Sequence, residues 1–135
     1  MAKAVLIADD NDSVRRALCE AFARDSAFEV CAEAHDGRDS IEKALRLHPD
    51  LIVLDFSMPV MNGLDAAREL KDRMPSVPII LFTFHVDLFV KEAALPSGVS
   101  DVVSKSEDVS VLITKARSLL YQNARESLLS PIGKS

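Results

Sequence analysis

Two apolar runs in this sequence end in carboxylates. Asp9 and Asp10 follow VLIA (5–8), and Asp55 closes LIVLD (51–55). An ionised carboxylate costs several kcal/mol to bury without a partner, so Asp55 must either reach solvent or meet a cation. Two further polar residues stand in equivalent places, because Thr83 ends PIILFT (78–83) and Lys105 follows DVVS (101–104).

The segments that carry these residues alternate between apolar strands and amphipathic helices. The predicted strands are 5–8, 28–34, 51–55, 78–83 and 101–104. The first helix, capped by Asn11 or Asp12, is predicted from apolar residues at helical spacing: Val14, Ala17, Leu18, Ala21 and Phe22. Further helices are predicted over 36–47, from the Asn62-Gly63 turn to about Met74-Pro75, over 87–95 before Pro96 and Gly98, and from 106–108 onward.

Five strand–helix units with apolar strands predict a doubly wound α/β fold. Such strands are buried on both faces of a parallel sheet, and right-handed crossovers place helices on both sides. Ligand crevices of open α/β sheets form at the carboxyl ends of the strands. We therefore expect Asp9, Asp10, Asp55, Thr83 and Lys105 to converge.

The expected cluster has a chemistry of its own. Three carboxylates and one ammonium sum to a formal charge of −2, which favours binding of a divalent cation, and Mg²⁺ prefers hard oxygen ligands. Beside such an ion, Asp55 could act as a nucleophile that takes a phosphoryl group as an acyl phosphate. Lys105 would balance charge on the transferred oxygens, and the Thr83 hydroxyl could hydrogen-bond to one of them.

With these residues in view, the sequence resembles the CheY-like receiver domain of two-component response regulators. The resemblance rests on IADDND (7–12), LIVLDFSMPVMNG (51–63), PIILFT (78–83) and the Lys105 of VVSK, and it covers roughly residues 3–122. It implies a flavodoxin-like (βα)5 sheet of order 2-1-3-4-5. The receiver domain would occupy residues 1–122, with a helical extension or tail over 123–135.

The resemblance also implies a role for each site residue. Asp10 would bind Mg²⁺ directly, Asp9 mainly through water, and the backbone carbonyl of Ser57 would complete the metal site. Asp55 would be the phosphoacceptor. The phosphodonor would be a histidine kinase or a phosphotransfer protein.

Two positions differ from the usual receiver pattern, and a third carries a separate hypothesis about the site. Val102 stands where the family carries Tyr or Phe, and Phe84 replaces a small residue after Thr83. His85 lies near the expected rim, where we hypothesise that it modulates water access to the acyl phosphate. The resemblance implies that phosphorylation changes the face formed by the fourth helix, fifth strand and fifth helix. Leu88, Phe89 and Val90 form an apolar stretch in this region, which packs into the core or, where it is exposed, marks a docking patch.

Composition narrows the class of protein. The 135 residues are 48% hydrophobic and 27% charged, which is typical of one globular domain. The net charge of −5 argues against direct nucleic-acid binding, and the apolar stretches are too short for a membrane span. We expect a cytoplasmic protein, a monomer or weak homodimer, with Cys19 and Cys31 as reduced core residues.

Several functional hypotheses remain open at this stage. The first is a stand-alone response regulator that signals through protein contacts and turns over no separate substrate beyond its own phosphotransfer and dephosphorylation. The second is the N-terminal regulatory domain of a DNA-binding transcription factor. A pseudo-receiver adaptor that is not phosphorylated follows, and so does a metal-dependent phosphatase or hydrolase, which would need a second Asp where this chain has Ser57.

Overall fold

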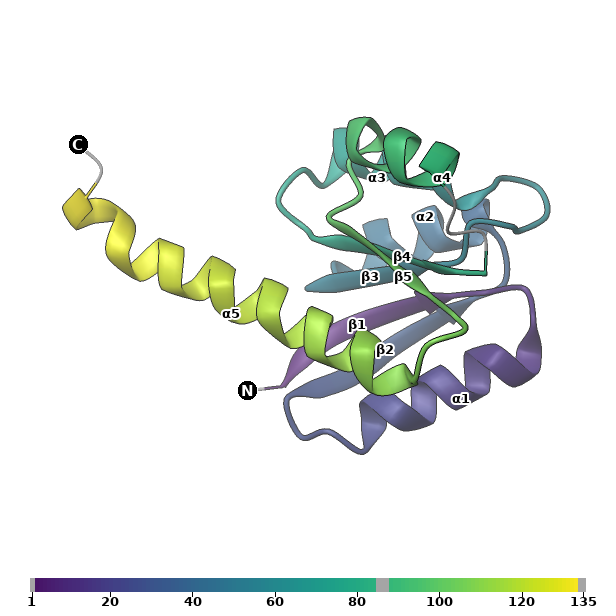
Figure 1. Cartoon of the computed structure of the whole chain (residues 1–135), viewed down its shortest axis with the longest axis horizontal. Helices are drawn as coiled ribbons and strands as arrows, with labels where there is room; N and C mark the ends of the chain where they lie inside the picture. The colour runs from purple at the N-terminus through teal and green to yellow at the C-terminus, as the bar shows by residue number, and fades with distance from the viewer. Residues whose placement is uncertain (1, 85–87, 134–135) are drawn as a thin grey trace.

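The fold is a five-stranded parallel sheet between two layers of helices (Figure 1). The computed structural model describes the backbone of residues 2–84 and 88–133 and the side chains of residues 2–84 and 90–121. The strands are β1 (Lys3–Ala8), β2 (Phe28–Ala34), β3 (Leu51–Leu54), β4 (Ile79–Thr83) and β5 (Asp101–Ser104). All pair in parallel in the order β2-β1-β3-β4-β5, which confirms the predicted fold class and strand order.

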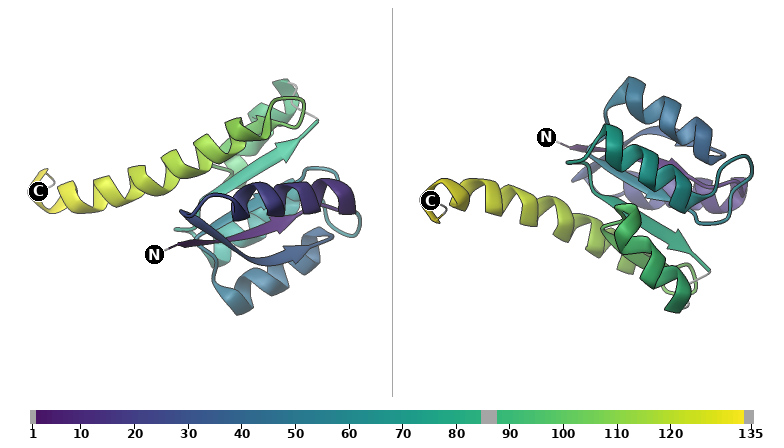
Figure 2. Two further views of the ribbon diagram at one scale, coloured as in Figure 1. Left: turned by 90° about the horizontal axis from the view of Figure 1, so that it is seen from below. Right: turned by 90° about the horizontal axis from the view of Figure 1, so that it is seen from above.

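The helices cover both faces of this sheet. They are α1 (Asp12–Ala23), α2 (Gly37–Leu47), α3 (Gly63–Arg73), α4 (Leu88–Ala94) and α5 (Val109–Gly133), with a short 3-10 turn, η1 (Leu95–Ser97), after α4. Figures 1 and 2 show α1 and α5 on one face and α2, α3 and α4 on the other. This is the arrangement that right-handed crossovers produce.

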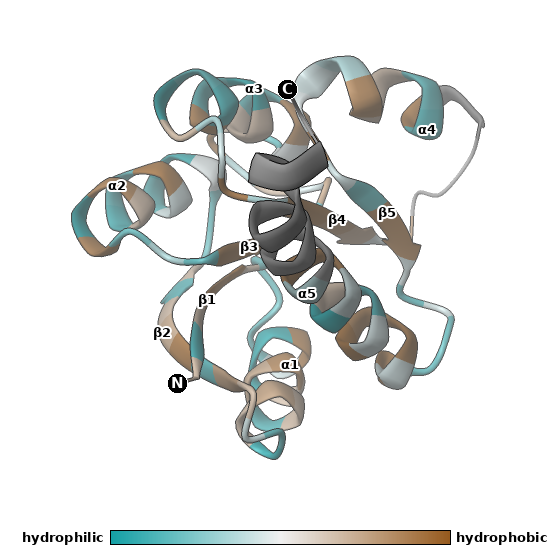
Figure 3. Ribbon diagram, turned by 90° about the vertical axis from the view of Figure 1, so that its left-hand side faces the viewer, coloured by the Kyte–Doolittle hydropathy of each residue, from teal (hydrophilic) through white to brown (hydrophobic). Residues whose placement is uncertain are grey.

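The alternation of side chains along each strand builds two separate cores. Leu6, Ile52, Leu54, Ile79 and Leu81 point to the α2–α4 side of the sheet. Their chain neighbours point to the α1–α5 side: Val5, Ile7, Leu51, Val53, Ile80 and Phe82. Figure 3 shows the resulting apolar sheet between more polar helix surfaces. Burial on both faces explains why the strands are continuous apolar runs.

Side-chain caps begin three of the helices directly after the carboxyl edge of the sheet. The side-chain oxygens of Asn11, Asp36 and Asn62 each accept a hydrogen bond from the backbone N–H three residues later, at 2.7–3.0 Å. Asn11 rather than Asp12 is therefore the cap of α1. These caps fix where the loops at this edge turn into helices.

The segment after β4 follows the prediction in outline. α4 ends at Ala94, η1 carries Pro96, and Gly98 adopts a left-handed conformation with φ of 93°, so the chain turns where Pro96 and Gly98 were expected to end the helix. Asp87, the predicted first residue of this helix, lies outside the described residues. Val90 and Ala94 are buried core residues, while the side chains of Leu88 and Phe89 are not described.

The last helix is the longest element of the chain. α5 spans 25 residues, about 38 Å at the rise of an α-helix, and its C-terminal part projects beyond the sheet (Figure 2). It begins at Val109, one residue after the predicted start region, and continues without a break through residue 123. The predicted boundary between a domain over 1–122 and an extension over 123–135 stays a prediction. No helix among the described residues combines the length and hydropathy needed to cross a bilayer.

The two cysteines lie at the margins of the two cores. Both are free and half-buried, with Cys19 on the α1–α5 side and Cys31 on the α2–α4 side. Burial, helped by the nearby Glu33, raises the pKa of the Cys19 thiol to about 11. This thiol therefore stays protonated at neutral pH and acts as a packing residue.

Candidate functional site

A pocket of about 230 Å³ opens at the carboxyl edge of the sheet. It is lined by residues from the four loops after β1, β3, β4 and β5 and from the first turn of α1: Asp9, Asp10, Asn11, Val14, Asp55, Ser57, Phe84 and Lys105. The structure therefore brings together the predicted residues from the ends of β1, β3 and β5. Thr83 adjoins this group as the last residue of β4.

Asp9 lies at the base of this pocket and is 1% exposed. One carboxylate oxygen accepts a hydrogen bond from the backbone N–H of Asn11 at 2.9 Å. The other lies 2.6 Å from the Lys105 Nζ. Both oxygens of this buried carboxylate are therefore engaged, one by the turn into α1 and one by the cation from β5.

Asp55 is the first residue after β3 and is 6% exposed. Its Oδ2 lies 3.2 Å from the Lys105 Nζ, and its backbone N–H donates to the carbonyl of Ala8 at 3.0 Å. Burial raises the pKa of Asp55 above the ordinary value for Asp. Lys105 acts in the opposite direction, Asp9 raises the pKa further, and a hydrogen bond from the Thr83 side chain lowers it. The Asp55 carboxylate thus contacts a cation and also lines the pocket.

Lys105 reaches into the pocket from the loop after β5. Its side chain is 7% exposed, and its backbone N–H donates to the Thr83 carbonyl at 2.9 Å, which ties the two strand ends together. The ammonium also lies 5.7 Å from the centroid of the Phe84 ring. Phe84 itself is 67% exposed, so its ring covers the lysine side of the rim without entering the core.

Asp10 completes an acidic cluster with the geometry of a metal site. One oxygen each from Asp9, Asp10 and Asp55 lie within 4.8 Å of one another, and Asp10 is exposed. Three hard oxygen donors around one opening, offset by a single ammonium, fit the preference of Mg²⁺. The residues therefore suit the metal that the sequence predicted, and Ser57 lies on the same rim. The individual ligand roles, including that of the Ser57 carbonyl, stay predictions.

The backbone of Asp55 packs against Gly63, which the sequence predicted only as part of a turn. A Cβ at Gly63 would lie 2.2 Å from the backbone oxygen of Asp55, a contact that no side chain can make. The Gly63 N–H also donates to the Phe56 carbonyl at 2.8 Å. Gly63 is thus required because α3 begins against the backbone that carries Asp55.

Arg15 lies beside the pocket although the sequence pattern did not predict a place for it there. Its guanidinium donates to the backbone carbonyl of Asp9 at 2.7 Å, and it also contacts Asp12 and Glu33. The only sequence signal was the spacing of Asp12 and Arg15, which is typical of an ordinary surface pair on a helix. The link to Glu33 depends on tertiary structure.

Two other predicted positions have different outcomes. Val102 is half-buried and packs against the α2–α4 core, so no aromatic ring occupies this part of β5. His85 lies outside the described residues, and its proposed effect on water access stays a hypothesis.

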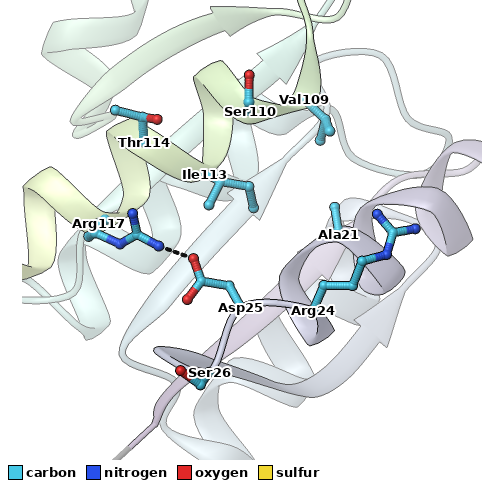
Figure 4. Close-up of a pocket in the computed structure, with 9 residues that line it drawn as sticks. All are labelled: Ala21, Arg24, Asp25, Ser26, Val109, Ser110, Ile113, Thr114 and Arg117. Carbon is cyan, nitrogen blue, oxygen red and sulfur yellow. Dashed lines mark hydrogen bonds and ion pairs between the residues drawn. The ribbon is translucent and has the colours of Figure 1, made fainter.

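A second, larger hollow contains no comparable chemistry. It is a groove of about 530 Å³ between the end of α1 and the first turns of α5, and it shares no lining residue with the acidic pocket. Figure 4 shows Arg117 of α5 reaching across to the Asp25 carboxylate. The remaining lining residues are small, apolar or hydroxyl-bearing, apart from Arg24. The acidic pocket, although smaller, is therefore the candidate site.

Comparison with known proteins points to the same group of proteins. A family model described as the response regulator receiver domain matches residues 5–117. The receiver domain of AraT, a response regulator from Geobacillus stearothermophilus, is 31% identical with a TM-score of 0.80, covering 92% of this chain and 99% of that one. A LuxR-family two-component response regulator from Aurantimonas sp. SI85-9A1 is 25% identical with a TM-score of 0.86, covering 90% of this chain and 87% of that one.

Curated relatives add a second likeness. A protein-glutamate methylesterase/protein-glutamine glutaminase from Pseudomonas aeruginosa is 37% identical over 125 residues, which are 90% of this chain and 34% of that protein. The chain spans about a third of the length of the relatives of this kind that it matches. Because the receiver model covers most of the chain and the sheet order agrees, this protein belongs to the response regulator receiver domain family.

Proposed function

We propose that this receiver domain accepts a phosphoryl group on Asp55 and signals through protein contacts. One observation supports this more than any other: a buried carboxylate and a buried ammonium, 3.2 Å apart, face an open pocket with two further carboxylates. A carboxylate in this setting is accessible to a donor from one side only. The charges needed for phosphoryl transfer are already gathered around it.

The transfer itself needs few groups. An Asp55 oxygen attacks the phosphorus of a phosphohistidine on the donor, a new O–P bond forms, and the N–P bond breaks. The electron pair of the broken bond stays on the donor imidazole, which takes a proton from solvent. Lys105 is placed to hold charge on the transferred oxygens, and the Thr83 hydroxyl, which already hydrogen-bonds to Asp55, is placed to contact one of them.

Asp9, Asp10 and Asp55, with the backbone carbonyl of Ser57, would hold Mg²⁺. When bound, this ion would neutralise negative charge on the phosphoryl oxygens. Without it, Lys105 alone offsets three carboxylates, so the residues of the pocket favour the bound form. The buried pair of Asp9 and Lys105 keeps the base of this site in place.

The partners follow from the same assignment. The donor would be a histidine kinase or a phosphotransfer protein, and the output would be a protein that distinguishes the two charge states of Asp55. The face formed by α4, β5 and α5 is a candidate output surface because β5 leads directly into Lys105. We further propose that the domain works as a monomer or a weak homodimer.

A second candidate places the same chemistry in a larger protein. The 37% identity to a methylesterase/glutaminase over 90% of this chain favours a receiver that regulates an attached enzyme of that kind over one that regulates a DNA-binding domain. A stand-alone receiver needs the same Asp55 chemistry. A phosphatase is less favoured, because Ser57 stands where a second acid would be needed.

The central test compares the wild type with Asp55→Asn after incubation with acetyl phosphate and Mg²⁺. Intact mass should increase by one phosphoryl group in the wild type and not in the variant. Asp101→Asn, which alters a half-exposed carboxylate at the start of β5, is the matched control and should be phosphorylated like the wild type. A mass gain in Asp55→Asn, or none in the wild type, would contradict the proposal.

A further inference from the structure

Arg15 joins three elements beside the acidic pocket. Its Nη1 donates to the Asp9 carbonyl at 2.7 Å, its Nε to a Glu33 oxygen at 3.0 Å, and its Nη2 to an Asp12 oxygen at 2.7 Å. The side chain is 17% exposed although it carries a charge. One guanidinium from α1 thus connects the end of β1, the first turn of α1 and the end of β2.

Both carboxylate contacts hold the guanidinium in a fixed orientation. Burial works against the charge of Arg15, but the hydrogen bonds that it donates to Asp12 and Glu33, with the negative charges of these carboxylates, outweigh burial and raise the pKa of this side chain. The backbone of Glu33 is anchored in turn, because its carbonyl accepts a hydrogen bond from the Lys43 Nζ of α2 at 2.5 Å. The third contact, to the Asp9 carbonyl, therefore comes from a guanidinium that two carboxylates already orient.

That carbonyl belongs to the peptide between Asp9 and Asp10. On its other side, the Asp9 N–H donates to the Ala34 carbonyl at 3.0 Å, so the backbone is fixed at both ends of Asp9. The Asp10 carboxylate has no hydrogen-bond or ion-pair partner among the described residues, although it lies within 4.8 Å of Asp9 and Asp55. The direction of the Asp10 side chain thus depends on the orientation of the peptide that Arg15 holds.

We propose that Arg15 is a positioning residue for the cation site: by holding the Asp9–Asp10 peptide against Glu33 and Asp12, it keeps the Asp10 carboxylate directed at the site. The inference rests on the proposed Mg²⁺ site and adds a residue that touches neither the ion nor the phosphoryl group. Lysine could not replace it, because an ammonium carries its three N–H groups on one nitrogen, whereas Arg15 reaches its partners from three separate nitrogens of a planar group.

Charge and geometry predict opposite results when Arg15 is removed. Loss of one positive charge beside three carboxylates should strengthen cation binding if charge alone mattered. Loss of the held peptide should weaken it, because residues that orient metal ligands typically contribute 10–100-fold to metal affinity. The sign of the change therefore separates positioning from simple electrostatics.

The test is a Mg²⁺ titration followed by backbone NMR shifts, with no phosphodonor present. We expect Arg15→Met and Arg15→Lys to raise the Kd for Mg²⁺ about tenfold. Arg16→Met, which removes the same charge from the exposed neighbour on α1, is the matched control and should bind as tightly as the wild type or slightly more tightly. The backbone NMR shifts of Arg15→Met should differ from those of the wild type mainly at Asp9 and Asp10.

A second variant covers the case in which Arg15→Met does not fold. Glu33→Gln keeps the guanidinium but weakens its anchor on β2, and we expect it to raise the Kd about threefold, below the range for losing the positioning residue itself. If the folded Arg15 variants bind Mg²⁺ as tightly as the wild type does, the proposed positioning role is wrong. If the Arg15 variants do not fold, the same conclusion follows when Glu33→Gln binds Mg²⁺ as tightly as the wild type. If the wild type itself binds no Mg²⁺, the proposed function fails as well.

Discussion

The two sides of the acidic pocket are built in different ways. On the β1–β3 side, which carries Asp9, Asp10 and Asp55, the backbone itself is packed into place. Gly63 leaves no room for a Cβ against the Asp55 carbonyl, and Arg15 holds the Asp9 carbonyl. On the β4–β5 side, the pocket is completed by side chains rather than by backbone: the buried Lys105 side chain, which extends to the Asp9 and Asp55 carboxylates, and the exposed ring of Phe84.

This difference separates binding from sensing. Groups that must hold an ion need fixed positions, and a packed backbone provides them. Groups that respond to a new charge on Asp55 must be able to move, and a lysine with several rotatable bonds can do so without unfolding a strand. We therefore expect a change at Gly63, which packs against the backbone of the β1–β3 side, to act through backbone position, and a change at Lys105 on the β4–β5 side to act through charge.

The largest effect is expected from Lys105→Met. Removal of the ammonium leaves the buried carboxylates of Asp9 and Asp55 facing each other without a cation, and breaking such a pair should lower the free energy of unfolding by about 3 kcal/mol. Urea denaturation in the absence of Mg²⁺ measures it. Lys91→Met on the exposed side of α4 should change stability by less than about 0.5 kcal/mol.

The charge origin of that loss can be checked directly. Asp55→Asn added to Lys105→Met removes one of the two unpaired charges and should restore part of the stability. If the double variant is no more stable than Lys105→Met, the loss does not come from the unpaired carboxylates. The two sides of the pocket would then not differ in the way described.

Gly63→Ala tests the packed side and should have the second largest effect. The added methyl group meets the backbone of Asp55 rather than a flexible side chain, so relief requires a shift of α3 or of the loop after β3, at about 2 kcal/mol. Chemical denaturation gives the loss, and the Mg²⁺ affinity should fall with it because Asp55 moves. Asp72→Ala, exposed on the same helix, should leave both unchanged.

The strands and the site could both be predicted from the sequence because both faces of the parallel sheet are buried. LIVLD and VLIA are apolar without interruption because both faces of the sheet are buried, and a carboxylate after such a run can lie only at the strand end. Parallel topology then brings Asp9, Asp10, Asp55 and Lys105 to one edge. In the structure these four residues line one pocket, which Phe84 also lines, while their roles in the site stay predictions.

Features that depend on contacts between elements could not be predicted. Arg15 looks like a surface partner of Asp12. Only the placement of β2 beside α1 brings Glu33 within its reach, and only the turn between β1 and α1 directs the Asp9 carbonyl at its guanidinium. Gly63 looks like half of a turn dipeptide, and its closeness to the Asp55 backbone follows from how α3 packs. The choice between Asn11 and Asp12 as helix cap likewise depends on a backbone conformation that both residues allow.

Asp55→Asn should have a smaller effect of opposite sign. Burial raises the pKa of Asp55 in the folded state, so the folded protein binds this proton more tightly than the unfolded chain does. The contribution to stability is therefore present below the unfolded pKa, about 4, and is lost as pH rises through the folded pKa. We expect Asp55→Asn to be more stable than the wild type by about 1 kcal/mol at pH 7 without Mg²⁺.

Urea denaturation at neutral and acidic pH measures this difference. It should shrink as pH falls through the raised folded-state pKa of Asp55 and should be smallest below about 4, where Asp55 is protonated in both the folded and the unfolded wild type. Added Mg²⁺ should also shrink it, because the ion stabilises only the protein that binds it. Asp72→Asn, at an exposed carboxylate, is the control, and a wild type more stable than Asp55→Asn at neutral pH without Mg²⁺ would contradict the expected sign.

The smallest effect is expected at the β5 edge, from Lys115→Ala. The Lys115 Nζ lies 3.1 Å from an Asp101 oxygen, but the two side chains are 48% and 33% exposed, so water and salt screen the pair. We expect a loss of about 0.3 kcal/mol in low salt that disappears in high salt, as measured by thermal unfolding. A salt-independent loss above about 1 kcal/mol would show that β5 is held from outside the pocket. Lys105 would then be fixed through its strand as firmly as Asp55 is through Gly63, and the β4–β5 side could not respond by moving one side chain.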